Sequence, residues 1–235
     1  MKPVLDVVNL TASIGRVPVL RGVHLHVEPG ETVALLGRNG VGKTSTLRAV
    51  LGLLARKSGH VHFNGEDLAR LPAHRVSSQG IGYVPQGRGI FPHLTVEENL
   101  FLGLRERPDP VILDYIYGRF SRLLERRHQS AGTLSGGEQQ ILALGRCLMR
   151  SPKLILLDEP TEGIMPKLVN EIRREISTIA SRGVAVLLVE QNLRTALKLA
   201  SRIYLMEKGI VVHEATPVQL SADPSAVHRY LGVSI

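Results

Sequence analysis

Gly37-Arg38-Asn39-Gly40-Val41-Gly42-Lys43-Thr44 decides the fold class of this 235-residue chain. Two glycines with four residues between them precede a lysine and a threonine, which is the pattern of a phosphate-binding loop. The loop follows an apolar run that we expect to be a strand, Thr32–Leu36, and precedes an expected helix, Ser45–Leu54. Glycines let successive backbone N–H groups converge on phosphate oxygens at the positive end of that helix. The residues expected to hold the phosphates are Gly37, Arg38, Asn39, Gly40, Val41, Gly42, Lys43, Thr44 and Ser45.

The last residues of this loop add more specific chemistry. Lys43 supplies a positive charge for the β- and γ-phosphates, and the Thr44 hydroxyl can coordinate Mg²⁺. An ordinary glycine turn with a surface lysine is the alternative, but a strand before the loop and a helix after it argue against that interpretation. The sequence therefore predicts a chain that binds a nucleoside triphosphate together with Mg²⁺.

The overall composition limits the kind of protein. The hydrophobic fraction of 43% is ample for a packed core, and no apolar run is long enough to cross a bilayer. The formal net charge of +8 suits an anionic partner, either nucleic acid or the negative face of a membrane. The densest basic clusters, at 119–122 and 125–128, are interpreted as a solvated helical face. The single cysteine, Cys147, is expected to lie on a packed helix, and its presence without a second cysteine fits a reducing compartment.

The order of strand-like and helix-like segments predicts an α/β fold. Apolar and polar residues alternate in Val23–Val27, as in antiparallel strands, and place His24 and His26 on one face. These two histidines could hold a metal, but no third ligand is apparent near them in the sequence, so a solvated strand face is the favoured interpretation. Later segments alternate between buried strands and helices, which predicts a mostly parallel sheet. The expected elements are strands at Ile81–Pro85, Lys153–Leu157, Val184–Glu190 and Arg202–Met206, and helices at Pro166–Ser181 and Asn192–Ala200.

Two acids follow the apolar run Leu154–Leu157 and mark a second candidate site. The carboxyl ends of strands are where open α/β sheets bind ligands. Asp158 is expected to hold Mg²⁺, and Glu159 is expected to orient or deprotonate an attacking water. The acid pair could instead cap a helix, but the following Pro160 favours a loop.

A third pattern is Ser135-Gly136-Gly137 before a helix. Exposed N–H groups and a hydroxyl at such a point can bind an anion. The alternative is an ordinary helix N-cap with loop glycines. The nucleotide interpretation gains weight from the other motifs in the same chain.

Taken together, these motifs resemble the ATP-binding subunits of ABC transporters along essentially the whole chain. The resemblance implies a P-loop NTPase core with a mostly parallel sheet at about 1–86 and 151–235, an N-terminal antiparallel β subdomain, and an inserted α-helical subdomain at about 87–150. It implies that Ser135, Gly136 and Gly137 bind ATP held by a second ATPase subunit. It also implies that Gln86 senses Mg²⁺ and links the catalytic site to the helical subdomain, which docks on two transmembrane permease subunits.

Within this family the chain resembles a subgroup that serves uptake of branched-chain amino acids, with urea and short-amide importers as near relatives. The segments that carry this likeness are Val84–Leu100, Arg126–Gln129, Glu159–Ile164 and Val189–Asn192. The likeness implies ATP hydrolysis at the cytoplasmic face of the cell membrane, with a solute-binding protein as an indirect partner and no nucleic acid. Two alternatives stay open: a soluble ATPase that acts on nucleic acid or ribosomes, and a non-hydrolysing adaptor.

Three positions depart from the family pattern. Ile14 stands where many members stack the adenine on a tyrosine, so we expect weaker nucleotide binding. Gln191 stands at the position of the switch histidine and can donate a hydrogen bond but cannot become cationic. Met165 stands where relatives often have aspartate in the loop that contacts the other subunit. The last two departures suggest that the second ATPase subunit is non-identical.

Overall fold

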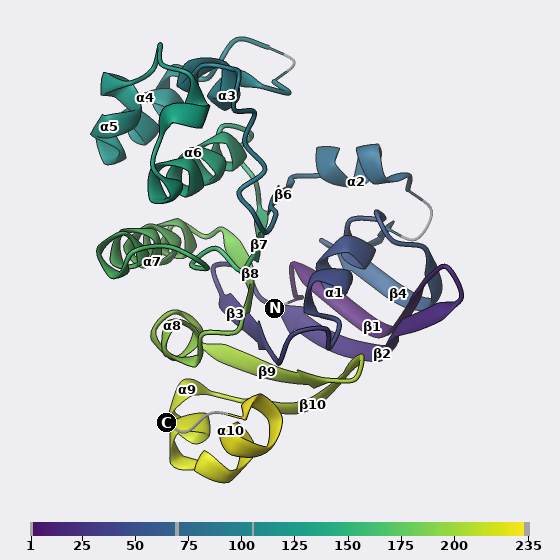
Figure 1. Cartoon of the computed structure of the whole chain (residues 1–235). Helices are drawn as coiled ribbons and strands as arrows, with labels where there is room; N and C mark the ends of the chain where they lie inside the picture. Colours follow the sequence, from purple (N-terminus) through teal and green to yellow (C-terminus); the bar gives the residue numbers. More distant parts are fainter. Residues whose placement is uncertain (1, 69–70, 105, 233–235) are drawn as a thin grey trace.

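The computed structural model describes residues 2–68, 71–104 and 106–232 and contains two sheets (Figure 1). The smaller sheet has the strand order β2-β1-β4-β5, and the larger one has the order β10-β9-β3-β8-β7-β6. The strands of the smaller sheet are β1 (Leu5–Ile14), β2 (Val17–Val27), β4 (Arg56–Phe63) and β5 (Glu66–Asp67). The strands of the larger sheet are β3 (Thr32–Leu36), β6 (Ile81–Val84), β7 (Leu154–Asp158), β8 (Ala185–Glu190), β9 (Arg202–Glu207) and β10 (Ile210–Ala215).

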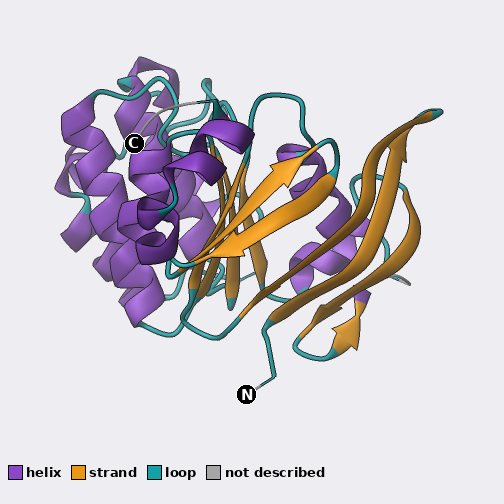
Figure 2. Ribbon diagram, turned by 90° about the horizontal axis from the view of Figure 1, so that it is seen from below, coloured by secondary structure: helices purple, strands orange, loops and turns teal. Residues whose placement is uncertain are grey.

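The smaller sheet is antiparallel, as the alternation in its sequence predicted. Val23, Leu25 and Val27 of β2 are buried, while the histidines between them are exposed or half-buried. The buried side chains belong to one hydrophobic cluster with residues of α1 (Lys43–Val50) and of the larger sheet. The helix α1 therefore lies in the apolar layer between the two sheets, and most other helices cover the opposite side of the larger sheet (Figure 2).

The larger sheet is parallel except for its edge strand β10, which pairs antiparallel with β9. All residues of β3, β7 and β8 are buried. Along β7, Leu154 and Leu156 enter the cluster beside the antiparallel sheet, while Ile155 and Leu157 enter the cluster under the helices. A sheet covered on both faces needs apolar residues at every position, which explains the unbroken apolar runs of these strands. All three strands end at one edge, where the candidate site residues follow.

A group of helices occupies the chain between β6 and β7 and is drawn in teal in Figure 1. It comprises α3 (Val96–Phe101), α4 (Pro110–Arg119), α5 (Ser121–Glu125), a 3-10 turn (Ala131–Thr133) and α6 (Gly136–Leu148). Buried apolar side chains of these helices join those of β7, β8 and α7 (Pro166–Ser181) in a second cluster. Cys147 is buried in α6, and burial raises the pKa of its thiol to about 12. This thiol is therefore a packed side chain, as expected.

The sequence predictions of single elements differ from the structure in a few places. The helix after the phosphate loop begins at Lys43, two residues earlier than expected, and ends at Val50 because Gly52 turns the chain with a φ of 71°. Three short helices had no counterpart in the predictions: α2 (Ala73–Ser78), α9 (Pro217–Ala222) and α10 (Pro224–Leu231). The predicted helix at Pro166–Ser181 is confirmed at both ends, and α8 (Leu193–Leu199) is one residue shorter at each end than predicted. Within the described ranges, no helix combines the length and the hydrophobicity that crossing a bilayer requires.

Candidate functional site

Two glycines of the phosphate loop lie where a larger residue would clash or be strained. Gly42 is the N-cap of α1 and has a φ of 115°, a conformation that L side chains rarely adopt. A Cβ atom on Gly37 would lie 2.6 Å from the backbone oxygen of Met206 in β9. The loop therefore lies directly against the end of β9, and its backbone leads into the N-terminus of α1. Such a helix start offers unpaired N–H groups to an anion.

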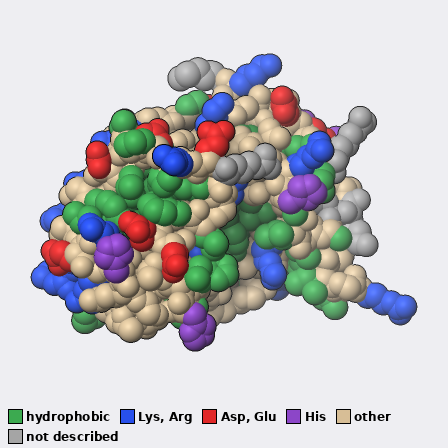
Figure 3. Space-filling model, turned by 90° about the horizontal axis from the view of Figure 1, so that it is seen from above, with side chains coloured by type: hydrophobic (Ala, Val, Ile, Leu, Met, Phe, Trp, Pro, Cys, Tyr) green, Lys and Arg blue, Asp and Glu red, His purple; other side chains and the backbone are tan. Residues whose placement is uncertain are grey.

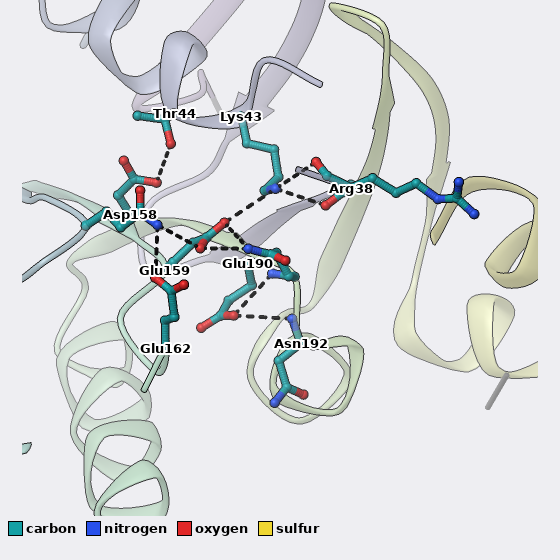
Figure 4. A network of polar contacts seen from close by, with 11 residues as sticks. Arg38, Lys43, Thr44, Asp158, Glu159, Glu162, Glu190 and Asn192 are labelled. Atoms are coloured by element: carbon teal, nitrogen blue, oxygen red, sulfur yellow. Dashed lines mark hydrogen bonds and ion pairs between the residues drawn. The ribbon is translucent and has the colours of Figure 1, made fainter. Parts of the chain in front are cut away.

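Lys43 lies within this loop and points toward Glu159 (Figure 4). Its exposed fraction is only 5%. Its Nζ donates to the backbone oxygen of Gly37 at 2.9 Å and to that of Arg38 at 3.1 Å. It also forms an ion pair with Oε1 of Glu159 at 3.4 Å. The lysine thus connects the phosphate loop with the end of β7, and the carboxylate occupies one of the sides from which an anion could approach the ammonium group.

Thr44 and Asp158 form the next contact of the site. The Thr44 hydroxyl donates to Oδ1 of Asp158 at 2.9 Å, and the Tyr83 hydroxyl of β6 donates to Oδ2 at 3.3 Å. Burial raises the pKa of Asp158, although both hydrogen bonds act in the opposite direction. Burial and the neighbouring Asp158 charge also raise the pKa of Tyr83. A hydroxyl and a buried carboxylate at this distance are oxygen ligands of the kind that Mg²⁺ prefers, so the residues present fit that ion.

Glu159 is held by several donors at once. Nε2 of Gln191, in the loop after β8, donates to both carboxylate oxygens at 2.9 Å, and Nε2 of Gln86 donates to Oε2 at 3.3 Å. The residue has a φ of 50°, which is rare for a side chain of this size, and its N–H donates to the oxygen of Val189 at 2.9 Å. Unusual backbone conformations of this kind cluster at functional sites. The structure therefore brings Lys43, Gln86, Glu159 and Gln191 together, as the sequence grouped them.

Gln86 has a second partner that the sequence did not indicate. Its Nε2 donates to Oε2 of Glu162 at 2.9 Å. Among the described residues, no hydrogen bond is recorded between Gln86 and either Thr44 or Asp158. The Gln86 amide therefore contacts Glu159 and Glu162 in this structure. To serve as an Mg²⁺ ligand it would have to turn toward Asp158.

Glu190 is a site residue to which the sequence analysis gave no role. It is 3% exposed and ends β8. Its Oε1 accepts from the Thr161 hydroxyl at 2.6 Å, and its Oε2 accepts from the backbone N–H groups of Gln191 at 3.2 Å and Asn192 at 3.3 Å. Burial raises the pKa of this carboxyl against the effect of these bonds. The carboxylate of Glu190 joins the loop that follows Glu159 to the loop that carries Gln191. The only signal of this role in the sequence is an acid at the end of an otherwise apolar strand.

The Ser135-Gly136-Gly137 segment lies at the start of α6, with the helices drawn in teal. Ser135 is the N-cap of α6, and its hydroxyl donates to Glu138 at 2.7 Å in a capping box. It lines a pocket of about 810 Å³ with Phe120 and Met165, while the phosphate-loop residues are not part of that lining. Burial works to raise the pKa of Glu138, but the Ser135 bonds and the nearby arginines lower it overall.

Close packing also explains why the two other residues of this segment are glycines. A Cβ on Gly137 would lie 2.1 Å from the Leu168 side chain of α7, and one on Gly136 would meet the Arg88 guanidinium. The structure shows Ser135 as the N-cap of α6 in the single chain. Ile14 ends β1 and is 54% exposed, which leaves its side chain accessible.

Comparison with known proteins gives four findings, which agree on the family. The family model described as ABC transporter matches residues 20–162. The chain is 43% identical over 221 residues to the high-affinity branched-chain amino acid transport ATP-binding protein BraG of Pseudomonas aeruginosa, covering 93% of this chain and 95% of that protein. It is 37% identical to the lipopolysaccharide export system ATP-binding protein LptB of Escherichia coli K12, covering 91% of both chains. A solved ATP-binding cassette of an ABC transporter in its ADP conformation superposes with a TM-score of 0.84 at 25% identity, covering 99% of this chain and 100% of that one.

Proposed function

The chain belongs to the ABC transporter family as an ATP-binding subunit with ATPase activity, and from this premise we propose that it powers uptake of branched-chain amino acids. The proposal rests on the 43% identity to BraG, against 36% and 37% for LptB proteins. A urea or short-amide importer is the alternative within the same subgroup. Lipopolysaccharide export is a further candidate because the LptB relatives cover nearly the whole chain.

Lys43 carries the binding of the triphosphate in this proposal. Its ammonium group is buried and already oriented by the carbonyls of Gly37 and Arg38. A γ-phosphate that reached Lys43 would take the place that Glu159 holds at 3.4 Å. The single observation that supports triphosphate binding most is this buried lysine, which connects the phosphate loop with the proposed base.

Thr44 and Asp158 are the residues that would hold Mg²⁺, with Gln86 as a further oxygen ligand after its amide turns. When bound, the ion neutralises phosphate charge and orients the phosphate oxygens. The buried Asp158 carboxylate is suited to this role because its raised pKa indicates a charge that lacks full compensation.

Glu159 is the proposed general base for water attack on the γ-phosphate. Gln191 orients it, since one amide nitrogen contacts both carboxylate oxygens at 2.9 Å. Glu190 positions both residues indirectly, because it joins their two loops through Thr161 and the N–H of Gln191. Release of Glu159 from Lys43 then accompanies nucleotide binding and leaves the carboxylate available for the attacking water.

A second ATPase subunit completes the site in this account. The hydroxyl of Ser135 and the start of α6 would contact the triphosphate held by the other subunit. We propose that the other subunit is non-identical, because Gln191 cannot become cationic and the exposed Met165 replaces an acid in the loop toward the partner. Cooperative ATP hydrolysis by this chain alone, matched by its Gln191→His variant, would contradict the unequal pairing.

Membrane permease subunits are the proposed partners of the helical part of the chain, at about 87–150. A groove of about 560 Å³ lies between this part and the core and is lined mainly by apolar side chains. Its lining includes Leu51 and Leu53 after α1, Ala73 of α2, and Leu102 and Cys147 of the helical part. The face seen in Figure 3 is hollowed between its two halves, and hydrophobic side chains gather there. We propose that a cytoplasmic segment of a permease occupies this groove and that the chain is thereby peripheral to the membrane.

Transport assays test the solute. The chain is co-expressed with the permeases and the solute-binding protein encoded beside it, and the complex is reconstituted in vesicles. ATP-dependent uptake of labelled leucine, isoleucine or valine is expected, with no uptake of urea. Urea uptake without leucine uptake, or neighbouring genes for lipopolysaccharide export, would contradict the proposed solute and leave the ATPase assignment intact.

A further inference from the structure

We propose that His60, His62 and Asp67 form a binding site for a divalent transition-metal ion that prefers imidazole ligands, with Zn²⁺ as the best match. The three residues lie on β4 and β5 in the antiparallel sheet. They are separate from the residues that contact Lys43 and Glu159 in Figure 4. The inference does not depend on the transported solute.

The register of the sheet explains why the three side chains meet. His60 and His62 are two residues apart on one strand, so both leave the same face of the sheet. Asp67 is paired directly with His62 across the hairpin, which places its side chain on that face as well. The two imidazole rings are stacked with centroids 5.7 Å apart and an angle of 19° between their planes. The hairpin thus brings three possible ligands together at one point of the surface.

The distances suit a small coordination sphere. Nδ1 of His60 lies 3.0 Å from Oδ2 of Asp67, and one ligand atom from each of the three residues lies within 4.8 Å of the others. Tetrahedral Zn²⁺ with bonds of about 2.1 Å holds its ligand atoms roughly 3.4 Å apart. Small rotations of these partly exposed side chains close the remaining difference, since the side chains of His60 and Asp67 are 63% and 33% exposed. The same exposure lets a hydrated ion enter and leaves water as the fourth ligand.

The types of ligand determine which class of metal ion the site prefers. Two imidazoles and one carboxylate suit Zn²⁺ and its neighbours in the first transition series, whereas Mg²⁺ and Ca²⁺ prefer oxygen ligands throughout. Asp6 of β1 is paired directly with His62 on the side away from Asp67, so a second carboxylate residue flanks the same position. Two carboxylates beside the histidine pair make this part of a basic chain favourable for a cation. A bound ion would connect the two-residue edge strand β5 to β4 and stabilise the hairpin.

The simpler interpretation is a surface hydrogen bond between His60 and Asp67 without any metal, which contributes little to stability. Metal titration distinguishes the two. Tag-free, nucleotide-free protein is titrated first with Co²⁺, whose visible absorption reports tetrahedral coordination, and then with Zn²⁺ by calorimetry. We expect one Zn²⁺ per chain and a rise in melting temperature on saturation.

Two variants and one matched control locate the ion. His62→Ala and His60→Ala are each expected to weaken Zn²⁺ binding at least tenfold, with basal ATPase activity unchanged as a check of folding. His24→Ala is the control, because His24 is an exposed histidine on β2 of the same sheet, outside the cluster. Stoichiometric binding that both cluster variants retain, an equal loss in the His24→Ala variant, or no binding by the unmodified protein at micromolar concentration would each overturn the proposal.

Discussion

Replacing Glu159 by glutamine separates its two roles in the account, as ion-pair partner of Lys43 and as general base. The carboxylate lies 3.4 Å from the ammonium group, with the two side chains 4% and 6% exposed. At an effective dielectric constant near 20 the attraction is roughly 5 kcal/mol, and the desolvation of both groups offsets most of it. Binding of a triphosphate must replace this contact. The Glu159→Gln variant removes that competition and one negative charge, so we expect ATP to bind about tenfold tighter, which is about 1.4 kcal/mol.

The rate of ATP hydrolysis should fall in the same variant, although ATP binds more tightly. A general base contributes about 10²–10⁴-fold, or roughly 3–5 kcal/mol of barrier, and glutamine cannot accept the proton. The amide still fits among Lys43 and the two glutamines, so the free energy of unfolding should change by no more than about 1 kcal/mol. Calorimetric ATP binding and single-turnover hydrolysis measure the two effects separately.

The matched control for this variant is Glu162→Gln. Glu162 contacts Gln86 at 2.9 Å, as Glu159 does at 3.3 Å, but no ion pair with Lys43 is recorded for it among the described residues. ATP affinity and turnover of the control should stay within about twofold of the unmodified protein. If the Glu159→Gln variant bound ATP with the affinity of the unmodified protein and hydrolysed it at the same rate, both roles would be refuted.

Three further changes test other parts of the site. Asp158→Asn should raise the free energy of unfolding of the nucleotide-free protein at pH 7, because burial raises the folded-state pKa of Asp158 and its ionised form is therefore costly above that pKa. The stability difference should disappear as the pH falls below about 3.8, where the unfolded carboxyl is protonated too, and urea titrations at several pH values measure it. Ile14→Tyr should tighten ATP binding by roughly 1–3 kcal/mol through stacking on the base, and an unchanged dissociation constant would count against that position for the adenine. Gln191→Ala should lower the rate of hydrolysis about 10²-fold while ATP affinity stays the same, since the lost amide only orients Glu159; equal losses in rate and affinity would argue against an orienting role.

The main elements of the fold could be predicted because their sequences carry strong local signals. The buried strands are unbroken apolar runs, and the phosphate loop has glycines at fixed spacing before a helix. The C-terminal helices were missed although capping signals were present. Thr216 forms a capping box with Gln219 before α9, and Asp223 caps α10, each with a proline at the first turn. Their short length hid any helical periodicity.

Contacts that depend on register or on neighbouring loops could not be predicted from the sequence. The sequence offered no third ligand for His24 and His26, which were expected on a solvated strand face, whereas His60, His62 and Asp67 lie close together in the structure. Only the pairing of β4 with β5 places Asp67 beside His62. In the same way, the role of Glu190 depends on Thr161, which is 29 residues away in the sequence.

The distance between Nζ of Lys43 and the carboxylate of Glu159 in a nucleotide-bound complex tests the central claim most directly. A structure of the unmodified chain with Mg²⁺ and a non-hydrolysable ATP analogue provides that measurement. The account predicts that the analogue's γ-phosphate contacts Lys43 and that the ion pair, now 3.4 Å long, opens beyond 4 Å. An analogue bound at full occupancy with this ion pair still closed would contradict it.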